Sequence, residues 1–118
     1  MKKKTLCFDL DNVICTTYKN HYTKSKPKKK IVNLINQLYD QGFIIKILTA
    51  RYSGRFNDDF SKVKKKGFKK TSNQLNKWGL KYHKLFMTKP SFDFYIDDKS
   101  YAFNNNWSKY IKKKFLNK

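Results

Sequence analysis

Glutamate is absent from this chain, arginine occurs only twice, and long apolar runs are missing. A membrane span needs about 20 consecutive apolar residues, and no apolar segment follows the basic start, so we expect neither a membrane protein nor a signal peptide. The two cysteines, Cys7 and Cys15, form no pair of metal-ligand type, and no Cys/His cluster surrounds them, which argues against a zinc site. We therefore expect reduced thiols in a cytoplasmic protein.

The charge that is present is almost entirely lysine. The 118 residues carry a formal net charge of +20, with 26 lysines against eight aspartates. Such a charge suits nucleic acid or another polyanion as a partner. The alternative is genome composition, because Lys and Asn are abundant, Ala is rare, and the lysines fall in separate runs at 2–4, 26–30, 64–66 and 112–114.

Four of the eight aspartates form the pairs Asp9/Asp11 and Asp97/Asp98, each of which comes directly after an apolar run. In an extended strand, residues two apart point to the same face, so Asp9 and Asp11 can aim at one small volume. Carboxylates that close repel each other unless a cation or a shared proton lies between them. The alternative is a solvated turn at the end of a strand, which Asp and Asn favour.

The hydrophobic pattern predicts strands and helices in alternation along one domain, residues 1–118. We expect strands over 4–8, 43–48, 82–87 and 92–96, and helices over 31–39, 72–78 and 101–116. This order predicts an α/β fold, a single Rossmann-like domain with a mostly parallel central sheet flanked by helices. Right-handed crossovers then place the carboxyl ends of the strands along one edge, where open α/β sheets bind ligands.

Single residues indicate where the helices begin and end. Pro27 suits the first turn of the first helix, which Gly42 would end. Thr71 or Ser72 is the candidate cap of the second helix, and Gly79 would close it.

Polar side chains follow several of the predicted strands. Asp9 and Asp11 follow the first strand and Thr49 the second, while Asp97 and Asp98 follow the strand predicted at 92–96. Since parallel strands end at a common edge, these five side chains are expected to converge there. This convergence favours a functional site over a set of unrelated turns.

Four segments resemble, in order, the motifs of the haloacid dehalogenase (HAD) superfamily of phosphatases. They are FDLDNVI at 8–14, ILTAR at 47–51, Lys89-Pro90, and YIDDKS at 95–100. TKPSFDFYIDDK and TSNQLNKWGLKYH resemble more narrowly its small capless capsule-biosynthesis phosphatases. The resemblance spans roughly residues 4–103, and four ordered motifs are far more specific than one DxD. Asn12-Val13 departs from the Gly-Thr of many members, and Lys89 lies close before the fourth predicted strand.

The resemblance implies an enzyme with four catalytic residues. Asp9 would attack phosphorus and form an aspartyl-phosphate, while Asp11 would protonate the leaving alcohol and later deprotonate water. Thr49 would hydrogen-bond one phosphoryl oxygen, and Lys89 would neutralise another while restraining Asp9. From the residues alone, the lesser alternative for Thr49 is the cap of a turn, and Lys89 is one of 26 lysines.

The same resemblance implies Mg²⁺ as cofactor. The cation would lie between Asp9 and the second aspartate pair, with the backbone carbonyl of Asp11 as a further oxygen ligand. Asp98 aligns with the direct metal ligand of the family, and Asp97 is the second choice.

Arg51 and Arg55 lie in the loop beside Thr49 and are candidates for clamping a second anionic group of the substrate, with a surface role as the alternative. The remaining candidates are expected to serve packing or the surface: His21, His83, Gln74 and Trp78.

The loop at 16–27 is too short for a folded cap domain, so the site is expected to be open. Water would be excluded by substrate, by the loops at 16–27 and 50–66, or by a second subunit of a homo-oligomer. We expect a Mg²⁺-dependent phosphomonoester hydrolase acting on a small phosphorylated metabolite, such as a sugar or polyol phosphate for surface polysaccharide (capsule) biosynthesis. The alternatives are a nucleic-acid 3′-phosphatase and a non-enzymatic, basic nucleic-acid-binding module on the same scaffold.

Overall fold

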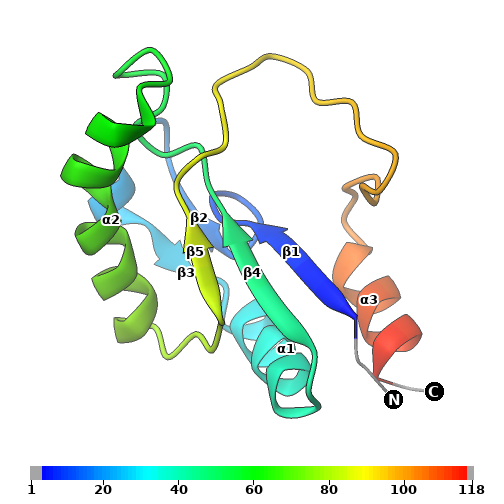
Figure 1. The fold of residues 1–118 in the computed structure, drawn as a ribbon. Helices are drawn as coiled ribbons and strands as arrows, with labels where there is room; N and C mark the ends of the chain where they lie inside the picture. The colour runs from blue at the N-terminus through cyan, green and yellow to red at the C-terminus, as the bar shows by residue number, and fades with distance from the viewer. Residues whose placement is uncertain (1–3, 117–118) are drawn as a thin grey trace.

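A three-stranded parallel sheet in the order β1-β4-β5 forms the centre of the computed structural model, which describes residues 4–116 (Figure 1). The strands are β1 (Thr5–Asp9), β4 (Ile44–Leu48) and β5 (Lys84–Phe86). Asp9 pairs with Leu48, and Leu48 with Phe86, so all three strands end at the same level. The predicted α/β fold with a parallel sheet is confirmed.

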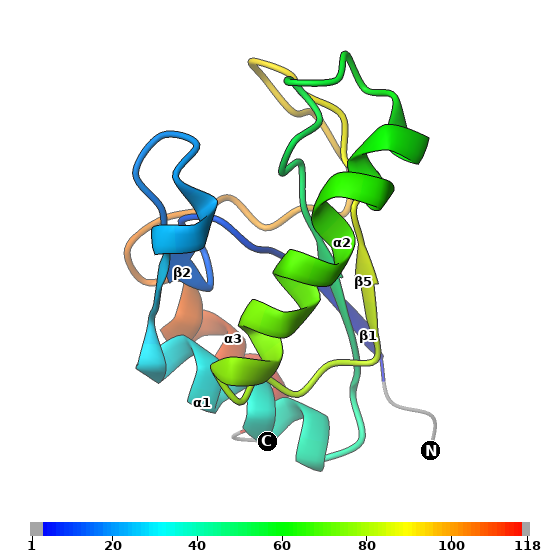
Figure 2. The same ribbon diagram turned by 90° about the vertical axis from the view of Figure 1, so that its left-hand side faces the viewer.

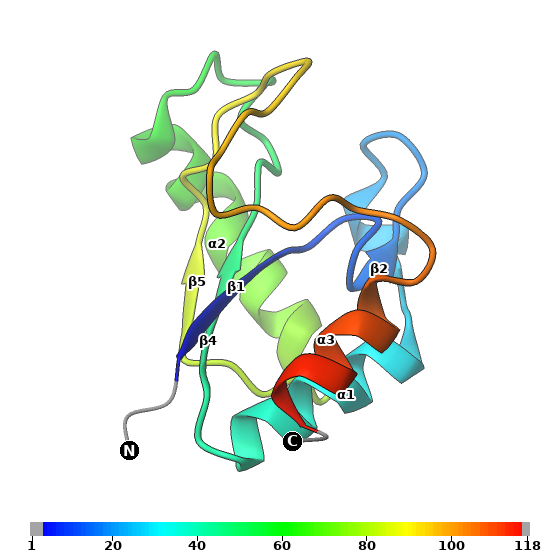
Figure 3. The same cartoon turned by 90° about the vertical axis from the view of Figure 1, so that its right-hand side faces the viewer.

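Three helices complete the fold: α1 (Lys29–Asp40), α2 (Phe60–Lys77) and α3 (Trp107–Phe115). Figures 2 and 3 show all three on the same face of the sheet, with α3 beside α1. Beyond β1 the chain forms a small antiparallel ribbon, β2 (Cys15–Thr16) with β3 (Lys26–Pro27), joined through the short helix η1 (Tyr22–Lys24).

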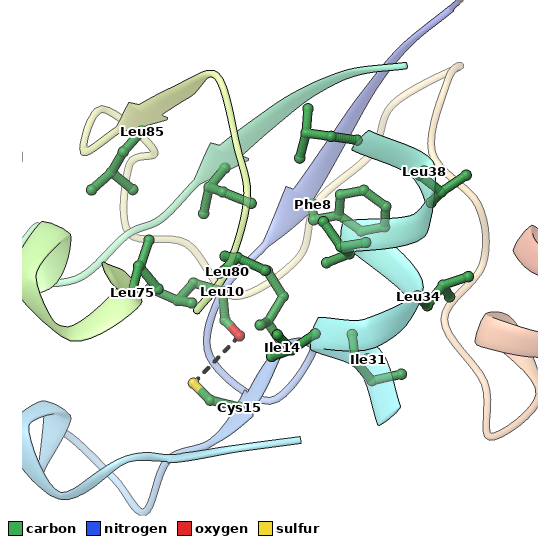
Figure 4. Close-up of a cluster of buried hydrophobic side chains, with 14 of the residues drawn as sticks. Phe8, Leu10, Ile14, Cys15, Ile31, Leu34, Leu38, Leu75, Leu80 and Leu85 are labelled. Atoms are coloured by element: carbon green, nitrogen blue, oxygen red, sulfur yellow. Dashed lines mark hydrogen bonds between the residues drawn. The ribbon is translucent and has the colours of Figure 1, made fainter. Parts of the chain in front are cut away.

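The hydrophobic core lies between the sheet and these helices. Figure 4 shows side chains from β1, α1, α2 and β5 meeting there, among them Phe8, Leu38, Leu75 and Leu85. Leu10 is fully buried between Asp9 and Asp11. The burial of Leu10 therefore fixes the backbone that carries both carboxylates.

The first helix follows the predicted spacing, because its buried residues recur at helical intervals, namely Ile31, Val32, Leu34, Ile35 and Leu38. The prediction that Pro27 lies in the first turn of this helix is wrong, because Pro27 pairs with Cys15 in the β2–β3 ribbon. Gly42 follows the helix with φ 97°, a left-handed conformation that favours glycine, so the predicted ending is confirmed.

The second helix begins at Phe60, well before the predicted start at Ser72. Its cap is Asp59, whose side chain accepts a hydrogen bond from the backbone N–H of Lys62 at 3.3 Å. Thr71 is a buried residue of the helix interior and not its cap. The lysines of the first half hid the apolar face, whose members recur every four residues: Val63, Gly67, Thr71 and Leu75.

The strand predicted at 92–96 does not form, and no strand among residues 4–116 pairs with the outer edge of β1. Phe94 and Ile96 are exposed, at 84% and 89%. Local bonds replace the ladder, because Asp97 accepts hydrogen bonds from the Tyr95 hydroxyl and the Lys99 backbone N–H. In Figure 1 this segment (yellow to orange) arches over the carboxyl ends of the strands and descends to α3.

The last helix, α3, begins at Trp107, later than the predicted start at residue 101. Neither cysteine forms a disulfide; Cys7 is exposed on β1 and Cys15 is buried. Within the part of the chain that the structure describes, every helix is too short or too polar to span a bilayer.

Candidate active site

Three of the predicted site residues meet at the carboxyl edge of the sheet. Asp9 is the last residue of β1, and Thr49 directly follows β4 beside it. Asp11 lies two residues beyond Asp9, at the start of a tight turn in which the Leu10 carbonyl accepts a hydrogen bond from the Ile14 N–H at 2.9 Å. The predicted convergence therefore holds for these three residues.

Asp11 is bound by a buried arginine. Nε of Arg51 lies 3.1 Å and 3.0 Å from the two carboxylate oxygens of Asp11, and Nη2 lies 2.8 Å from Oδ1. The hydroxyl of Thr17 donates a further bond to Oδ1 at 2.6 Å. The Arg51 side chain is only 2% exposed and that of Asp11 20%, so solvent screens this forked pair weakly.

Both terminal nitrogens of Arg51 also have partners other than Asp11. Nη1 donates to Oε1 of Gln74 at 2.7 Å, and Nη2 to the hydroxyl of Ser25 at 3.3 Å. Gln74 in turn donates from Nε2 to the Tyr22 carbonyl at 2.9 Å. The predicted clamp of Arg51 on substrate stays a prediction, while the contacts in the structure orient Asp11.

The sequence favours helix packing for Gln74 and does not reveal its bonds to Arg51 and to the Tyr22 carbonyl. The true extent of α2 would have pointed to Gln74, but the predicted helix began at Ser72 and so omitted the first three turns. Once α2 starts at Phe60, Gln74 lies three residues beyond the buried Thr71, on the same side of the helix.

Two tyrosine rings in an edge-on arrangement pack against the buried arginine. The Arg51 guanidinium lies 5.0 Å from the ring centre of Tyr22, which meets Tyr52 edge-on at 5.0 Å. Tyr52 has φ 67°, rare for a bulky residue, and packs against Gly67 of α2. A Cβ on Gly67 would come within 2.6 Å of the Tyr52 ring, which explains glycine inside this helix.

Asp9 has a looser environment. Its Oδ2 lies 3.6 Å from Nζ of Lys89, and the side chains are 39% and 17% exposed, respectively. Partial burial raises the pKa of Asp9, and the positive charge of Lys89 acts in the opposite direction. Asp9 is therefore an incompletely paired carboxylate at the open end of the site.

Thr49 is almost fully buried, at 1% exposure, and its hydroxyl accepts a bond from the Arg51 backbone N–H at 3.1 Å. It thus caps the turn after β4, the alternative that the sequence left open. An accepting hydroxyl still has its own proton to donate, so the predicted contact with a phosphoryl oxygen remains compatible with this position.

Asp97 and Asp98 do not follow a strand, and the structure does not place them at the sheet edge as predicted. Asp97 accepts the Lys99 N–H at 2.9 Å and the Tyr95 hydroxyl at 3.0 Å; these bonds, the backbone one foremost, lower the pKa of Asp97. It is Asp97, not the preferred Asp98, that lines the same groove as Asp9 among the described residues.

The donor chemistry of this region fits Mg²⁺. Carboxylate and carbonyl oxygens are its usual protein ligands, and it commonly uses only one or two carboxylates with water and substrate phosphate completing the shell. Asp9 and Asp97 supply two carboxylates on one groove. Within residues 4–116, no three Asp, Glu, His or Cys side chains come together as a preformed metal cluster.

A groove of about 980 Å³ leads from the two aspartates along β1 to α3, and we call it the β1–α3 groove. Its lining includes Asp9, Lys89, Tyr95, Tyr101, Trp107 and Tyr110. The site therefore opens into a channel walled by the segment after β5 and by α3.

The other candidates lie away from the carboxylates. Arg55 is exposed, with its guanidinium 5.1 Å from the ring centre of Tyr52. Nδ1 of His83 accepts the Ile45 N–H at 3.0 Å, and His21 contacts Tyr18 edge-on, at 5.8 Å between ring centres. Trp78 packs, half-buried, against the core.

No protein-family model and no curated protein matches the chain. Its structure is similar to that of an MCSG target from Vibrio cholerae, with a TM-score of 0.77 and 22% identity over 94% of this chain and 98% of that one. It is also similar to a chain of a Pnkp1/Rnl/Hen1 complex (TM-score 0.51, 15% identity) and of the Pnkp1/Rnl/Hen1 RNA repair complex (0.50, 16%). Those matches cover 98% of this chain but 34% and 32% of the others. At these identities, the likeness shows a common fold.

Proposed function

We propose that this chain is a phosphomonoester hydrolase of the HAD type with Asp9 as its nucleophile. The observation that carries the proposal is the pair Asp9 and Asp11 at the carboxyl edge of a parallel sheet, each beside a different cation. Lys89 faces the half-buried Asp9, whereas Arg51 holds Asp11. One carboxylate is thus open to a substrate and the other is fixed in place.

The reaction would proceed in two displacements. A carboxylate oxygen of Asp9 attacks phosphorus, the bond from phosphorus to the leaving oxygen breaks, and Asp11 supplies the proton that the departing alcohol needs. Water then attacks the aspartyl-phosphate and gives its proton to Asp11, while the electron pair of the broken P–O bond returns to the Asp9 carboxylate. Inorganic phosphate leaves and both aspartates are restored.

The two oxygens of Asp11 differ in their partners. Oδ1 accepts bonds from Nε and Nη2 of Arg51 and from Thr17, whereas Oδ2 accepts from Nε alone. We therefore assign proton transfer to Oδ2, because it accepts fewer hydrogen bonds and can still bind a proton. Arg51 is a positioning residue in this scheme, because it acts through Asp11.

Positive charge around the phosphoryl group would come from Lys89, with a hydrogen bond from Thr49. Mg²⁺ would be held by Asp9, the backbone carbonyl of Asp11 and an aspartate of the 97–98 pair. When bound, it would neutralise phosphoryl charge as the transition state forms.

Two substrate classes fit an open site of this kind. A small phosphorylated metabolite, such as a sugar or polyol phosphate of capsule biosynthesis, is the expectation from the sequence resemblance. The second is the phosphorylated end of a nucleic acid, favoured by the +20 charge and by fold similarity to a chain of an RNA repair complex.

The direct test is phosphate release from a panel of phosphomonoesters, with Mg²⁺ and with a chelator. The panel would contain p-nitrophenyl phosphate, sugar and polyol phosphates, and oligonucleotides with a 3′-phosphate. We expect chelator-sensitive release from at least one substrate class. Failure of every phosphomonoester in the presence of Mg²⁺ would refute the proposal. For the nucleic-acid class, kcat/KM should fall steeply with salt, because binding then involves the release of counterions.

A further inference from the structure

The β1–α3 groove is large for a single phosphate group. Its volume of about 980 Å³ lies at the upper end of the ~300–1,000 Å³ typical of ligand pockets. It begins at Asp9 and continues past β1 to α3, so a substrate held there would extend well beyond the reacting phosphate. The course of its outer wall can be followed in Figure 3, in the orange segment that leads into α3.

Aromatic rings form the far part of this groove. Tyr101 and Tyr110 stack nearly parallel, with ring centres 4.5 Å apart at 10°, and each remains 42% exposed. Phe103 is 60% exposed and lies 6.0 Å from Trp107 between ring centres. A contiguous set of exposed rings of this kind marks an interaction site, because water solvates their faces poorly.

Lysines line the same groove as these rings. Lys89 lies beside Asp9 at one end, Lys99 and Lys114 are further lining residues, and Nζ of Lys114 lies 3.3 Å from the Tyr110 hydroxyl. Helix α3 adds three further lysines and no acidic residue: Lys109, Lys112 and Lys113. The aspartates of the groove belong to the proposed site itself, so the far part carries positive charge only.

Exposed rings between cations are the chemistry that binds single-stranded nucleic acid. Every base has a face that stacks on an aromatic ring, and lysines neutralise the phosphates between bases. A small sugar phosphate can also lie on an aromatic ring, but it would fill only part of a groove of about 980 Å³. A duplex would keep its base faces covered, so it could use only the lysines.

We infer that the β1–α3 groove binds a single-stranded nucleic acid, with bases on Tyr101, Phe103 and Tyr110 and the terminal phosphate at Asp9. This inference rests on the proposed phosphatase function for the reacting end only. Strand binding in the groove requires no hydrolysis and can be measured by itself.

The test measures binding of fluorescent single strands of about 12 nucleotides without a terminal phosphate, in RNA and DNA arms. We expect both single strands, or one of them, to bind the wild-type protein more tightly than a duplex of the same length. Tyr110→Leu should weaken binding roughly 5- to 150-fold, the range for loss of one base–ring stack, whereas Tyr110→Phe should retain it.

Two matched substitutions complete the experiment. Tyr18→Leu removes a ring that is 68% exposed but outside the groove lining, and it should leave binding unchanged. Lys114→Gln should lower the slope of log affinity against log salt by about 1, as expected for one phosphate contact. Circular dichroism of each variant checks that the fold is retained.

The inference would be overturned if neither the RNA nor the DNA strand binds. It would also be overturned if Tyr110→Leu and Tyr18→Leu change the affinity for the strand equally. A dimer that dissociates on Tyr110→Leu would assign the groove to a second copy of the chain and also overturn it. Hydrolysis of p-nitrophenyl phosphate without strand binding would contradict the inference about the groove and leave the proposed phosphatase function intact. Strand binding without hydrolysis of any phosphomonoester would contradict the proposed phosphatase function and leave the inference about the groove intact. The chain would then be a nucleic-acid-binding module.

Discussion

The two aspartates of the site lie two residues apart but have opposite surroundings. Asp11 faces a buried arginine whose donors are taken up by side chains from the first loop and from α2. Asp9 faces one lysine at 3.6 Å and an open groove with exposed rings. Asp11 thus lies in a dense hydrogen-bonded network, whereas Asp9 is half-buried beside a single cation at the mouth of a groove.

This difference separates two tasks that a hydrolase must combine. A proton-transfer group has to be held within a narrow geometry, which buried networks achieve because each bond fixes the next. A nucleophile and its substrate channel must remain accessible, which sets a limit on how fully they are paired. Substitutions that remove similar contacts on the two sides should therefore have unequal effects.

The largest loss of stability is expected from Arg51→Met. The methionine keeps an apolar stem but leaves the mostly buried Asp11 without its cation, and breaking such a pair typically costs about 3–5 kcal/mol. Urea denaturation measures the change in the free energy of unfolding. Arg55→Met, at the exposed arginine of the same loop, is the control and should stay within about 1 kcal/mol of wild type. Equal losses in both variants would contradict a special role for the Arg51–Asp11 pair.

Gln74→Leu should have an intermediate effect. It removes the bonds to Arg51 and to the Tyr22 carbonyl and leaves part-buried polar atoms unpaired, for about 1–3 kcal/mol. Because Gln74 acts through Arg51 on Asp11, kcat should fall more than KM rises. Asn73 is exposed, precedes Gln74 in the sequence and lies outside the network. Asn73→Leu is therefore the control, and it should leave stability and kcat close to those of wild type. A KM effect alone in Gln74→Leu would indicate a substrate contact instead.

Lys89→Met repeats the loss of a cation on the other side of the site. The pair with Asp9 is longer and partly exposed, so its removal should change stability by no more than about 1 kcal/mol. Phosphate release should nevertheless fall, since a positive charge beside the phosphoryl group is lost. A stability loss as large as that of Arg51→Met would show that the two sides are alike.

The smallest expected effect is a gain in stability. The pKa of Asp9 is raised in the folded state, so its protonated form stabilises the fold relative to its ionised form. This contribution of Asp9 to the free energy of unfolding is fully present below the unfolded pKa of about 3.8. It is lost as pH rises through the folded pKa. At neutral pH the ionised carboxylate is therefore unfavourable, and Asp9→Asn should be at least as stable as wild type. Relative to wild type, this variant should lose the advantage below about pH 3.8. Asp93→Asn removes a carboxylate that is exposed and lies outside the site, and it is the matched control for the Asp9→Asn measurement.

Much of the fold and part of the site were predictable from the sequence. The parallel strands, the apolar face of α1 and the ending at Gly42 follow from local patterns of apolar residues and glycine. The meeting of Asp9, Asp11 and Thr49 follows from parallel topology, because strands that run the same way end at one edge.

The failures have identifiable physical causes. The first half of α2 was hidden by lysines on its exposed side, and with it the position of Gln74. Residues 92–96 alternate as a strand should, but a strand also needs a partner, and the bonds around Asp97 form a local turn instead. The burial of Arg51 depends on Gly67, Tyr52 and Tyr22, which pattern reasoning cannot bring together.

The central claim is that Asp9 is the nucleophile, and it is tested most directly by phosphate release from Asp9→Asn beside wild type, at neutral pH with Mg²⁺. The account predicts a loss of at least about 10³-fold in kcat/KM with the fold and stability retained. Wild-type-like turnover by a folded Asp9→Asn protein would contradict it.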